Sequence, residues 1–324
     1  MFKQTVYLNE VLKSSENFLY SRAMLIKELI RPIISNWLVN RIAFFVLKHV
    51  RFIVPVRLLV RVPLNGIAEC KISKSKKLRY YSNADDPIAP GLFFNGLKEY
   101  EPETIELFLT LARQSQTIFD IGANTGIYAL IAAIENSSST VHAFEPLPRV
   151  FQRLEYNRTL NQAHNLELSQ YGISDSSGMA TLFVPIGTMP TSSSIQKGHR
   201  RAVETVEIKT ITIDSYVINN NIQKLDLIKI DTETTEPAVL KGGLRTISRD
   251  KPTIICEVLH PEQAKLINEI LDDLGYLYFW INSDGLVKNS KIVPDKHFNF
   301  LNHLFIHEDY TKRLKGIAQI KREN

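Results

Sequence analysis

Residues 117–128 read TIFDIGANTGIY, and this stretch decides the fold. An apolar run ends in Asp120, a turn with Gly122 and Gly126 follows, and residues 127–135 have a helix-compatible composition. The pattern predicts a buried strand, a tight turn and the start of a helix. Because glycine lacks a Cβ atom, we expect a ligand to approach the backbone here. Its negative group would lie on the free helix amides and its positive group on Asp120.

A ligand that carries both charges, such as the methionyl part of S-adenosylmethionine (SAM), suits this turn. The glycine spacing is G-x-x-x-G and differs from the G-x-G-x-x-G of pyrophosphate sites, which argues against a nicotinamide or flavin dinucleotide. The alternative for these residues alone is an ordinary strand-to-helix turn.

The composition is that of a globular protein, with 44% hydrophobic and 23% charged residues among 324. The two cysteines, Cys70 and Cys256, lie far apart and in no metal-ligand spacing. They indicate a reducing, cytoplasmic compartment, no disulfide framework and no zinc site. The chain opens without the pattern of a signal peptide, so we expect none.

The basic residues are concentrated in the first third of the chain. Residues 1–100 hold 16 Lys and Arg against 7 Asp and Glu, and residues 29–68 contain no acid. No nucleic-acid-binding signature accompanies this charge, so we expect no nucleic-acid partner. Residues 1–62 are predicted to be helical and amphipathic, and residues 29–62 contain no uncharged run long enough to span a bilayer. A helical appendage packed on the core is favoured, and the alternatives are peripheral contact with an anionic membrane and a dimer surface.

From residue 117 onward, strands and helices alternate, which predicts an α/β fold with a parallel sheet. The late strands 277–281 and 303–307 could form an antiparallel edge. We predict three parts: residues 1–90, basic, helical and ending in a hairpin over 66–82; a catalytic domain over 91–310; and a polar basic tail over 311–324. The predicted strands are 117–121, 140–144, 166–173, 181–185, 205–212, 225–230 and 252–258, and the predicted helices are 103–113, 126–136, 148–163, 214–219, 236–248 and 261–274, with a loop over 85–96.

Acidic residues follow most of the predicted central strands. In a parallel sheet these ends meet at one edge, where ligands bind. Glu145 ends the second strand, 23 residues after Gly122. An acid at this distance from a glycine-rich turn accepts hydrogen bonds from both hydroxyls of a ribose, so the ligand is expected to be a nucleoside.

The sequence resembles the FkbM family of SAM-dependent methyltransferases over roughly residues 92–308. The resemblance implies a class I methyltransferase fold with a seven-stranded sheet of order 3-2-1-4-5-7-6, SAM as methyl donor and O-methylation of a sugar or polyketide hydroxyl. One departure is Thr234, where the family usually has glycine after Glu233. The residues that carry the resemblance are Glu99–Glu101, Phe119–Gly126, Phe144–Pro146, Thr212–Tyr216, Asp226–Glu233, Glu236 and Leu240–Gly242.

Roles follow by position in this resemblance. Asp231 is the first candidate for the general base, and Glu233 and Glu257 could bind acceptor hydroxyls or assist the base. A divalent cation on these acids is the less favoured alternative, so no metal site is predicted. Ser174 or Asp175 could contact the adenine amino group, and the loop 191–194 could contact the acceptor. The predicted cofactor residues are Asp120, Gly122, Ala123, Asn124 and Gly126 for the methionyl part, Glu145 and Pro146 for the ribose, and Gly172 and Ile173 for the adenine.

The sequence therefore predicts an enzyme that methylates a hydroxyl of a sugar, glycan, glycolipid or related small acceptor. Two alternatives stay open, a methyltransferase of protein or nucleic acid and a non-catalytic scaffold in surface-glycan assembly. The sequence does not give the oligomeric state.

Overall fold

The computed structural model describes residues 36–50, 59–185, 203–283, 285–295, 297, 300–314 and 320–322. The predicted acceptor loop at 191–194 lies outside the described residues, as do residues 1–35 and 51–58 of the predicted N-terminal helical segment.

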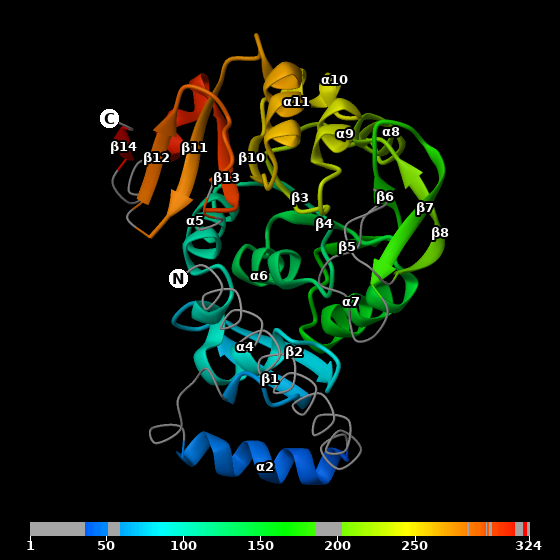
Figure 1. Cartoon of the computed structure of the whole chain (residues 1–324), viewed down its shortest axis with the longest axis vertical. Helices are drawn as coiled ribbons and strands as arrows, with labels where there is room; N and C mark the ends of the chain where they lie inside the picture. The colour runs from blue at the N-terminus through cyan, green and yellow to red at the C-terminus, as the bar shows by residue number, and fades with distance from the viewer. Residues whose placement is uncertain are drawn as a thin grey trace, which may run out of the picture.

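A nine-stranded sheet forms the centre of the molecule (Figure 1). Its order is β14-β12-β11-β13-β10-β9-β3-β4-β5. The strands from β10 to β5 run parallel to one another, and β13 pairs antiparallel with both β10 and β11. The predicted order 3-2-1-4-5-7-6 is confirmed, and β12 and β14 extend the sheet beyond the seven strands implied. The strands are β3 (Thr117–Ile121), β4 (Thr140–Phe144), β5 (Leu166–Ser169), β9 (Leu227–Ile230), β10 (Thr253–Glu257), β11 (Tyr276–Asn282), β12 (Gly285–Asn289), β13 (Asn302–His307) and β14 (Ile320–Arg322).

Helices cover both faces of this sheet, which is why its central strands are almost wholly apolar. Successive residues of a strand point to opposite faces, so Ile118 joins one hydrophobic cluster with α5 and α6, and Phe119 joins another with α8 to α11. The helices are α5 (Pro102–Ala112), α6 (Ile127–Glu135), α7 (Pro148–Leu160), α8 (Ile213–Asn219), α9 (Glu236–Lys241), α10 (Leu244–Asp250) and α11 (Pro261–Leu271).

Two predicted elements are each divided in the structure. The predicted strand 166–173 becomes β5 in the main sheet and β6 (Gly172–Ile173) in a separate small sheet with β7 (Gly178–Pro185) and β8 (Val203–Ile211). The predicted helix 236–248 becomes α9 and α10 because Gly242 and Gly243 lie between them. A Cβ atom on Gly242 would overlap the Ser174 carbonyl oxygen, so this close approach requires glycine.

The N-terminal part packs directly on the main domain. The predicted hairpin is confirmed as β1 (Asn65–Lys71) and β2 (Lys77–Asn83), and the Tyr81 amide donates to Asn157 Oδ1 of α7, at 2.9 Å. The predicted loop 85–96 was wrong in part, since it contains α4 (Ala89–Asn95), whose proline lies in the first turn, where it is tolerated. Ahead of the hairpin lies α2 (Trp37–Val50), and the division of the chain at residue 90 stays a prediction.

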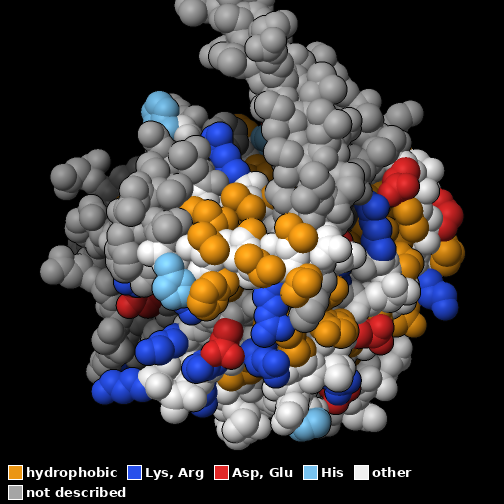
Figure 2. All heavy atoms as spheres, turned by 90° about the horizontal axis from the view of Figure 1, so that it is seen from below, with side chains coloured by type: hydrophobic (Ala, Val, Ile, Leu, Met, Phe, Trp, Pro, Cys, Tyr) orange, Lys and Arg blue, Asp and Glu red, His pale blue; other side chains and the backbone are white. Residues whose placement is uncertain are grey.

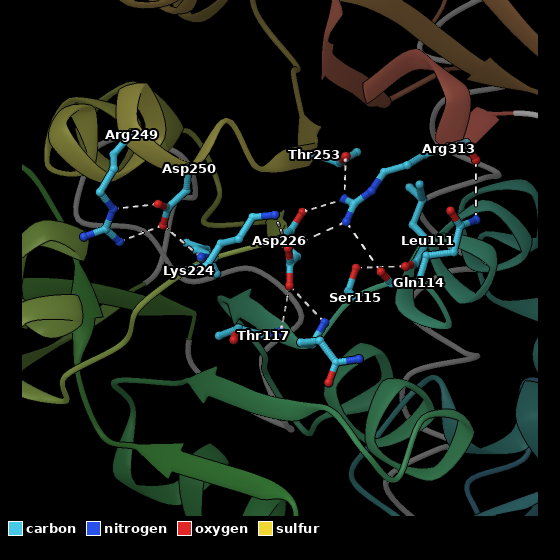
Figure 3. A network of polar contacts seen from close by, with 12 residues as sticks. Leu111, Gln114, Ser115, Thr117, Lys224, Asp226, Arg249, Asp250, Thr253 and Arg313 are labelled. Atoms are coloured by element: carbon cyan, nitrogen blue, oxygen red, sulfur yellow. Dashed lines mark hydrogen bonds and ion pairs between the residues drawn. The ribbon is translucent and has the colours of Figure 1, made fainter. Parts of the chain in front are cut away.

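A polar network ties the C-terminal segment to the amino ends of the central strands (Figure 3). Asp226, just before β9, accepts hydrogen bonds from the amides of Gln116 and Thr117, at 2.9 and 3.2 Å. Arg313 donates to the Asp226 carbonyl at 3.0 Å and to Thr253 Oγ1 at 3.3 Å. Arg313 belongs to the predicted polar tail, so the start of that tail is part of the fold.

Candidate functional site

The carboxyl ends of β3, β4, β9 and β10 surround one cavity of about 290 Å³. This volume lies near the lower end of the range for small-molecule sites. The end of β6 and apolar side chains of β7 and β8 complete its wall. Of the predicted site residues, Gly126, Ser174 and Asp175 are outside the lining, and Asp175 instead pairs with Lys241 at 2.9 Å. The predicted residues that line it are Asp120, Gly122, Ala123, Asn124, Glu145, Pro146, Gly172, Ile173, Asp231, Glu233 and Glu257.

The structure gives a reason for the two glycines of the turn after β3 other than the expected approach of a ligand. Gly122 and Gly126 have φ angles of +80° and +98°, which favour glycine. A Cβ atom on Gly122 would overlap the Asp231 carbonyl oxygen, and one on Gly126 would overlap the side chain of Leu154. The protein itself therefore fills the space that a Cβ atom on either glycine would need, while the backbone of Gly122 still lines the cavity. The consequence is that the turn lies directly against the end of β9.

The amides of this turn are also engaged by the protein. Those of Gly122 and Ala123 donate to the Phe144 carbonyl, and that of Asn124 donates to Glu145 Oε2 at 3.1 Å. The Thr125 and Gly126 amides donate within the turn itself. These five amides are therefore already paired within the protein. A negative group of a ligand could bind only to other amides at the start of the helix.

Asp120 is buried at the end of β3 and caps helix α6. Its Oδ2 atom accepts a hydrogen bond from the Ala129 amide, at 2.8 Å. Burial raises the pKa of Asp120 to about 7, although Lys229 and the Ala129 amide oppose the shift. A cationic ligand group nearby would hold this carboxyl in its ionised form.

Glu145 is buried at the end of β4, with both carboxyl oxygens in hydrogen bonds. Oε1 accepts from the Leu147 amide at 2.9 Å and Oε2 from the Asn124 amide at 3.1 Å. Burial raises its pKa to about 7, against the effect of these two amides. The amides fix the direction of the carboxylate, and its remaining lone pairs can accept from hydroxyl groups.

Lys229 is a fully buried cation behind the acidic end of β9. Its Nζ lies 3.2 Å from Asp231 Oδ2 and 5.1 Å from the centre of the Tyr128 ring. Burial disfavours its charge, but Asp231, Glu101 and other carboxylates raise its pKa above the ordinary range. Lys229 therefore forms a buried ion pair with Asp231.

Glu101 is a site residue that the sequence analysis did not assign. It precedes α5, and its Oε2 accepts from Tyr128 Oη at 2.6 Å and from Asn302 Nδ2 at 2.9 Å. Glu101 and Tyr128 line the cavity. The signal was present, because Glu101 stands directly before Pro102 within a stretch that carries the family resemblance.

Glu257, at the end of β10, is the acid of the site with the largest stated shift in pKa. Burial first, and then the negative charge of Asp231, raise its pKa to about 10. It is therefore protonated near neutral pH and can donate a hydrogen bond. A protonated acid is a poor general base, which leaves Asp231 as the carboxylate best suited to that role.

The turn after Asp231 holds Thr234 in a backbone conformation that favours glycine. Glu233 and Thr234 have φ angles of 55° and 86°, in the region that favours glycine. Glu236 Oε1 holds the turn through the amides of Thr232 at 2.9 Å and Thr234 at 3.3 Å. Threonine in this conformation costs on the order of 1–3 kcal/mol in backbone strain.

Within the ranges that the structure describes, no three His, Cys, Asp or Glu side chains are arranged to hold a metal ion. Each described acid discussed above is instead engaged with the protein or faces the cavity.

Comparison with known proteins gives a family match over the site. The model of the Methyltransferase FkbM domain matches residues 120–278. A hexuronic acid methyltransferase, AglP of Haloferax volcanii, is 33% identical over 143 residues, which is 44% of this chain and 56% of the relative. The 31-O-demethyl-FK506 methyltransferase FkbM of Streptomyces tacrolimicus is 26% identical over 157 residues, which is 40% of this chain and 60% of the relative.

The chain thus spans less than two thirds of the length of these relatives. Among solved structures, a methyltransferase FkbM from Methylobacillus flagellatus is 19% identical, with a TM-score of 0.41 over 68% of this chain and 54% of the other.

Proposed function

Residues 120–278 belong to the FkbM methyltransferase domain family, and from this premise we propose that the chain is a SAM-dependent O-methyltransferase. Its acceptor is a hydroxyl of a sugar, glycan, glycolipid or related small molecule. One observation carries the proposal: residues from four neighbouring strand ends, assigned separately to donor and acceptor, line one cavity.

The lining of the cavity suits the donor. Asp120 holds the cationic amino group, and Glu145 accepts from the ribose hydroxyls, with its carboxylate oriented by two amides. Gly172 and Ile173 flank the adenine, and Pro146 shapes the turn beside the ribose. When bound, SAM supplies a methyl group already activated on a sulfonium, so the chain's task is mainly to align it with the acceptor oxygen.

Asp231 would take the proton of the acceptor hydroxyl. Bound SAM would supply the methyl group to that oxygen, with cleavage of the bond between sulfur and the methyl carbon and S-adenosylhomocysteine as the leaving group. Lys229 Nζ forms an ion pair with this carboxylate at 3.2 Å, which fixes the position of Oδ2. Glu257, protonated near neutral pH, donates a hydrogen bond to a second oxygen of the acceptor, and Glu233 accepts one.

The charge of the cavity favours a neutral acceptor. Six carboxyl groups line it, and the described lining contains no Lys, Arg or His. A carboxylate on the acceptor would face this acidic wall, and the cation behind it, Lys229, is already paired with Asp231. We therefore propose a neutral hydroxyl compound for this chain, although a relative is named for a hexuronic acid. The six are Glu101, Asp120, Glu145, Asp231, Glu233 and Glu257.

The test compares the Asp231→Asn variant with the wild type. We expect the variant to keep its SAM affinity, measured by calorimetry, and to lose at least about 100-fold in turnover, the lower limit for removal of a general base. Turnover is measured as the mass shift of glycans and lipids extracted from cells that lack the protein and then treated with the enzyme. Near wild-type turnover would exclude Asp231 as the base. Failure of the wild type to bind SAM would contradict the proposal and favour the non-catalytic scaffold.

A further inference from the structure

Helix α2 is attached to the rest of the protein by one face. Asn40 Nδ2 donates to the Pro63 carbonyl at 2.8 Å, and Asn40 Oδ1 accepts from the Asn65 amide at 2.8 Å. One turn further on, the ring of Phe44 lies 5.0 Å from that of Phe93 and 5.4 Å from that of Phe94, both on α4. Asn40 and Phe44 are buried, so they define the inner face.

The outer face of α2 is apolar and exposed. Five large hydrophobic side chains on it are between 41% and 66% exposed. The described residues include eleven exposed side chains of this kind, so nearly half of them belong to one helix of 14 residues. Figure 2, which looks at the end of the molecule where α2 lies in Figure 1, shows hydrophobic side chains gathered on this face, with Lys and Arg and some Asp or Glu side chains beside them. The five are Leu38, Val39, Ile42, Phe45 and Val46.

The charge of the helix has one sign. Arg41 and Lys48 are exposed and lie seven residues, or about two turns, apart, hence on the same side. The helix has no acid, and none occurs anywhere in residues 29–68. Exposed apolar side chains flanked by cations are typical of helices that lie in the plane of a membrane surface. No helix in the described part of the chain is long and apolar enough to cross a membrane.

We propose that the outer face of α2 docks on an anionic lipid bilayer, with Leu38, Ile42 and Phe45 at the boundary of headgroups and acyl chains and with Arg41 and Lys48 at the lipid phosphates. Charge decides between this occupant and a second copy of the chain. Two copies of this acid-free helix would bring the cations Arg41 and Lys48 together, whereas an anionic bilayer is complementary to them.

The docking would also bring the cavity near the membrane. Helix α4, which packs on Phe44, follows Ile88, and Ile88 lines the cavity. A single short helix therefore separates the docking face from the site.

The experiment is flotation of the full-length protein with vesicles of phosphatidylcholine, with and without phosphatidylserine. We expect binding only to vesicles that contain phosphatidylserine, weakened by added salt. Ile42→Glu with Phe45→Glu should reduce binding more than tenfold, and Arg41→Gln with Lys48→Gln by about 30-fold, from roughly a factor of five per cation. Leu266→Glu on α11 is the matched control, because Leu266 is 48% exposed but lies on another element. Unchanged melting temperatures establish that the variants fold.

Three outcomes would overturn the proposal. The first is no binding by the wild type, and the second is equal binding to both kinds of vesicle. The third is full binding by the Ile42→Glu, Phe45→Glu variant, which would assign the contact to another segment. Light scattering on the same samples identifies the competing case, a wild-type dimer that the glutamates convert to a monomer without any vesicle binding. None of these readouts requires methyl transfer, so they are independent of the enzymatic proposal.

Discussion

Replacement of Glu145 by glutamine tests the donor half of the site most directly. The substitution keeps the size of the side chain and one carbonyl oxygen, but it removes the negative charge. In the wild type, two amides at 2.9 and 3.1 Å aim this carboxylate from within a buried position. The NH2 group of glutamine cannot accept a hydrogen bond, so one of these two amides loses its acceptor in the variant. The change in SAM affinity therefore reports on the charge together with the orientation of the side chain.

The expected loss follows from the strengths of the two kinds of hydrogen bond. A bond to a charged acceptor contributes roughly 1.5–3 kcal/mol, and a bond between neutral groups roughly 0.5–1.5 kcal/mol. Two ribose hydroxyls should each lose about 1 kcal/mol, so SAM affinity should fall by about 30-fold. Glu145→Ala, which removes both oxygens, should weaken binding further.

The pKa of Glu145 supplies a second, independent readout. Since burial raises it to about 7, the wild-type carboxyl is mainly ionised at pH 8 and mainly protonated at pH 6. SAM affinity of the wild type should therefore fall by up to about tenfold between these pH values. The contribution of this site is absent from Glu145→Gln, so its profile should be flatter.

The assay is titration calorimetry with SAM at both pH values. Glu155→Gln is the matched control, because Glu155 is an exposed acid of α7 that is not in the cavity lining. If Glu145→Gln binds SAM as tightly as the wild type at pH 8, the ribose assignment is wrong. If its affinity falls but keeps the wild-type pH profile, the pH dependence belongs to another group.

Three further predictions concern stability. Gly122→Ala should destabilise the protein by at least about 3 kcal/mol in chemical denaturation, because the new Cβ atom would overlap the Asp231 carbonyl oxygen at a positive φ. A loss below about 1 kcal/mol would show that the turn can move away from β9. Thr234→Gly should instead stabilise it by about 1 kcal/mol through release of backbone strain, and a lower free energy of unfolding would contradict this account. Burial raises the pKa of Glu145 from 4.5 to about 7, so the folded state binds more protons than the unfolded state between these values; the free energy of unfolding of the apo protein should fall as pH rises through this window, by on the order of 3 kcal/mol from this group, and the fall should be smaller in Glu145→Gln.

Several features of the site could be predicted from the sequence because they are local. The turn at residues 122–126 and the acid at Glu145 follow from short patterns and a fixed spacing. The carboxyl ends of parallel strands meet at one edge, so alternation of strands and helices suffices to bring Asp120, Glu145 and Asp231 together. The strand order came from the family resemblance, and the structure agrees with it.

Other features depend on partners that are distant in the sequence. Glu101 accepts a hydrogen bond from Asn302, which lies 201 residues later in the chain. No pattern in either segment predicts this contact. The two glycines were explained by an absent ligand, whereas the neighbours that exclude a Cβ atom are Asp231 and Leu154.

What the sequence by itself determined is therefore the order of the elements, the position of the candidate site and the identity of most residues around it. The tertiary structure decided their chemical states. Lys229 is held as a cation despite its burial, because Asp231 beside it and Glu101 and Glu257 from other elements surround it with negative charge. Glu257 is held as a neutral acid by its removal from water and by the charge of Asp231. The outer face of α2 was likewise separated from its inner face only by the packing of Asn40 and Phe44. Hydrophobic periodicity is a property of neighbouring residues, but burial and electrostatic interaction depend on distances that exist only in the folded chain.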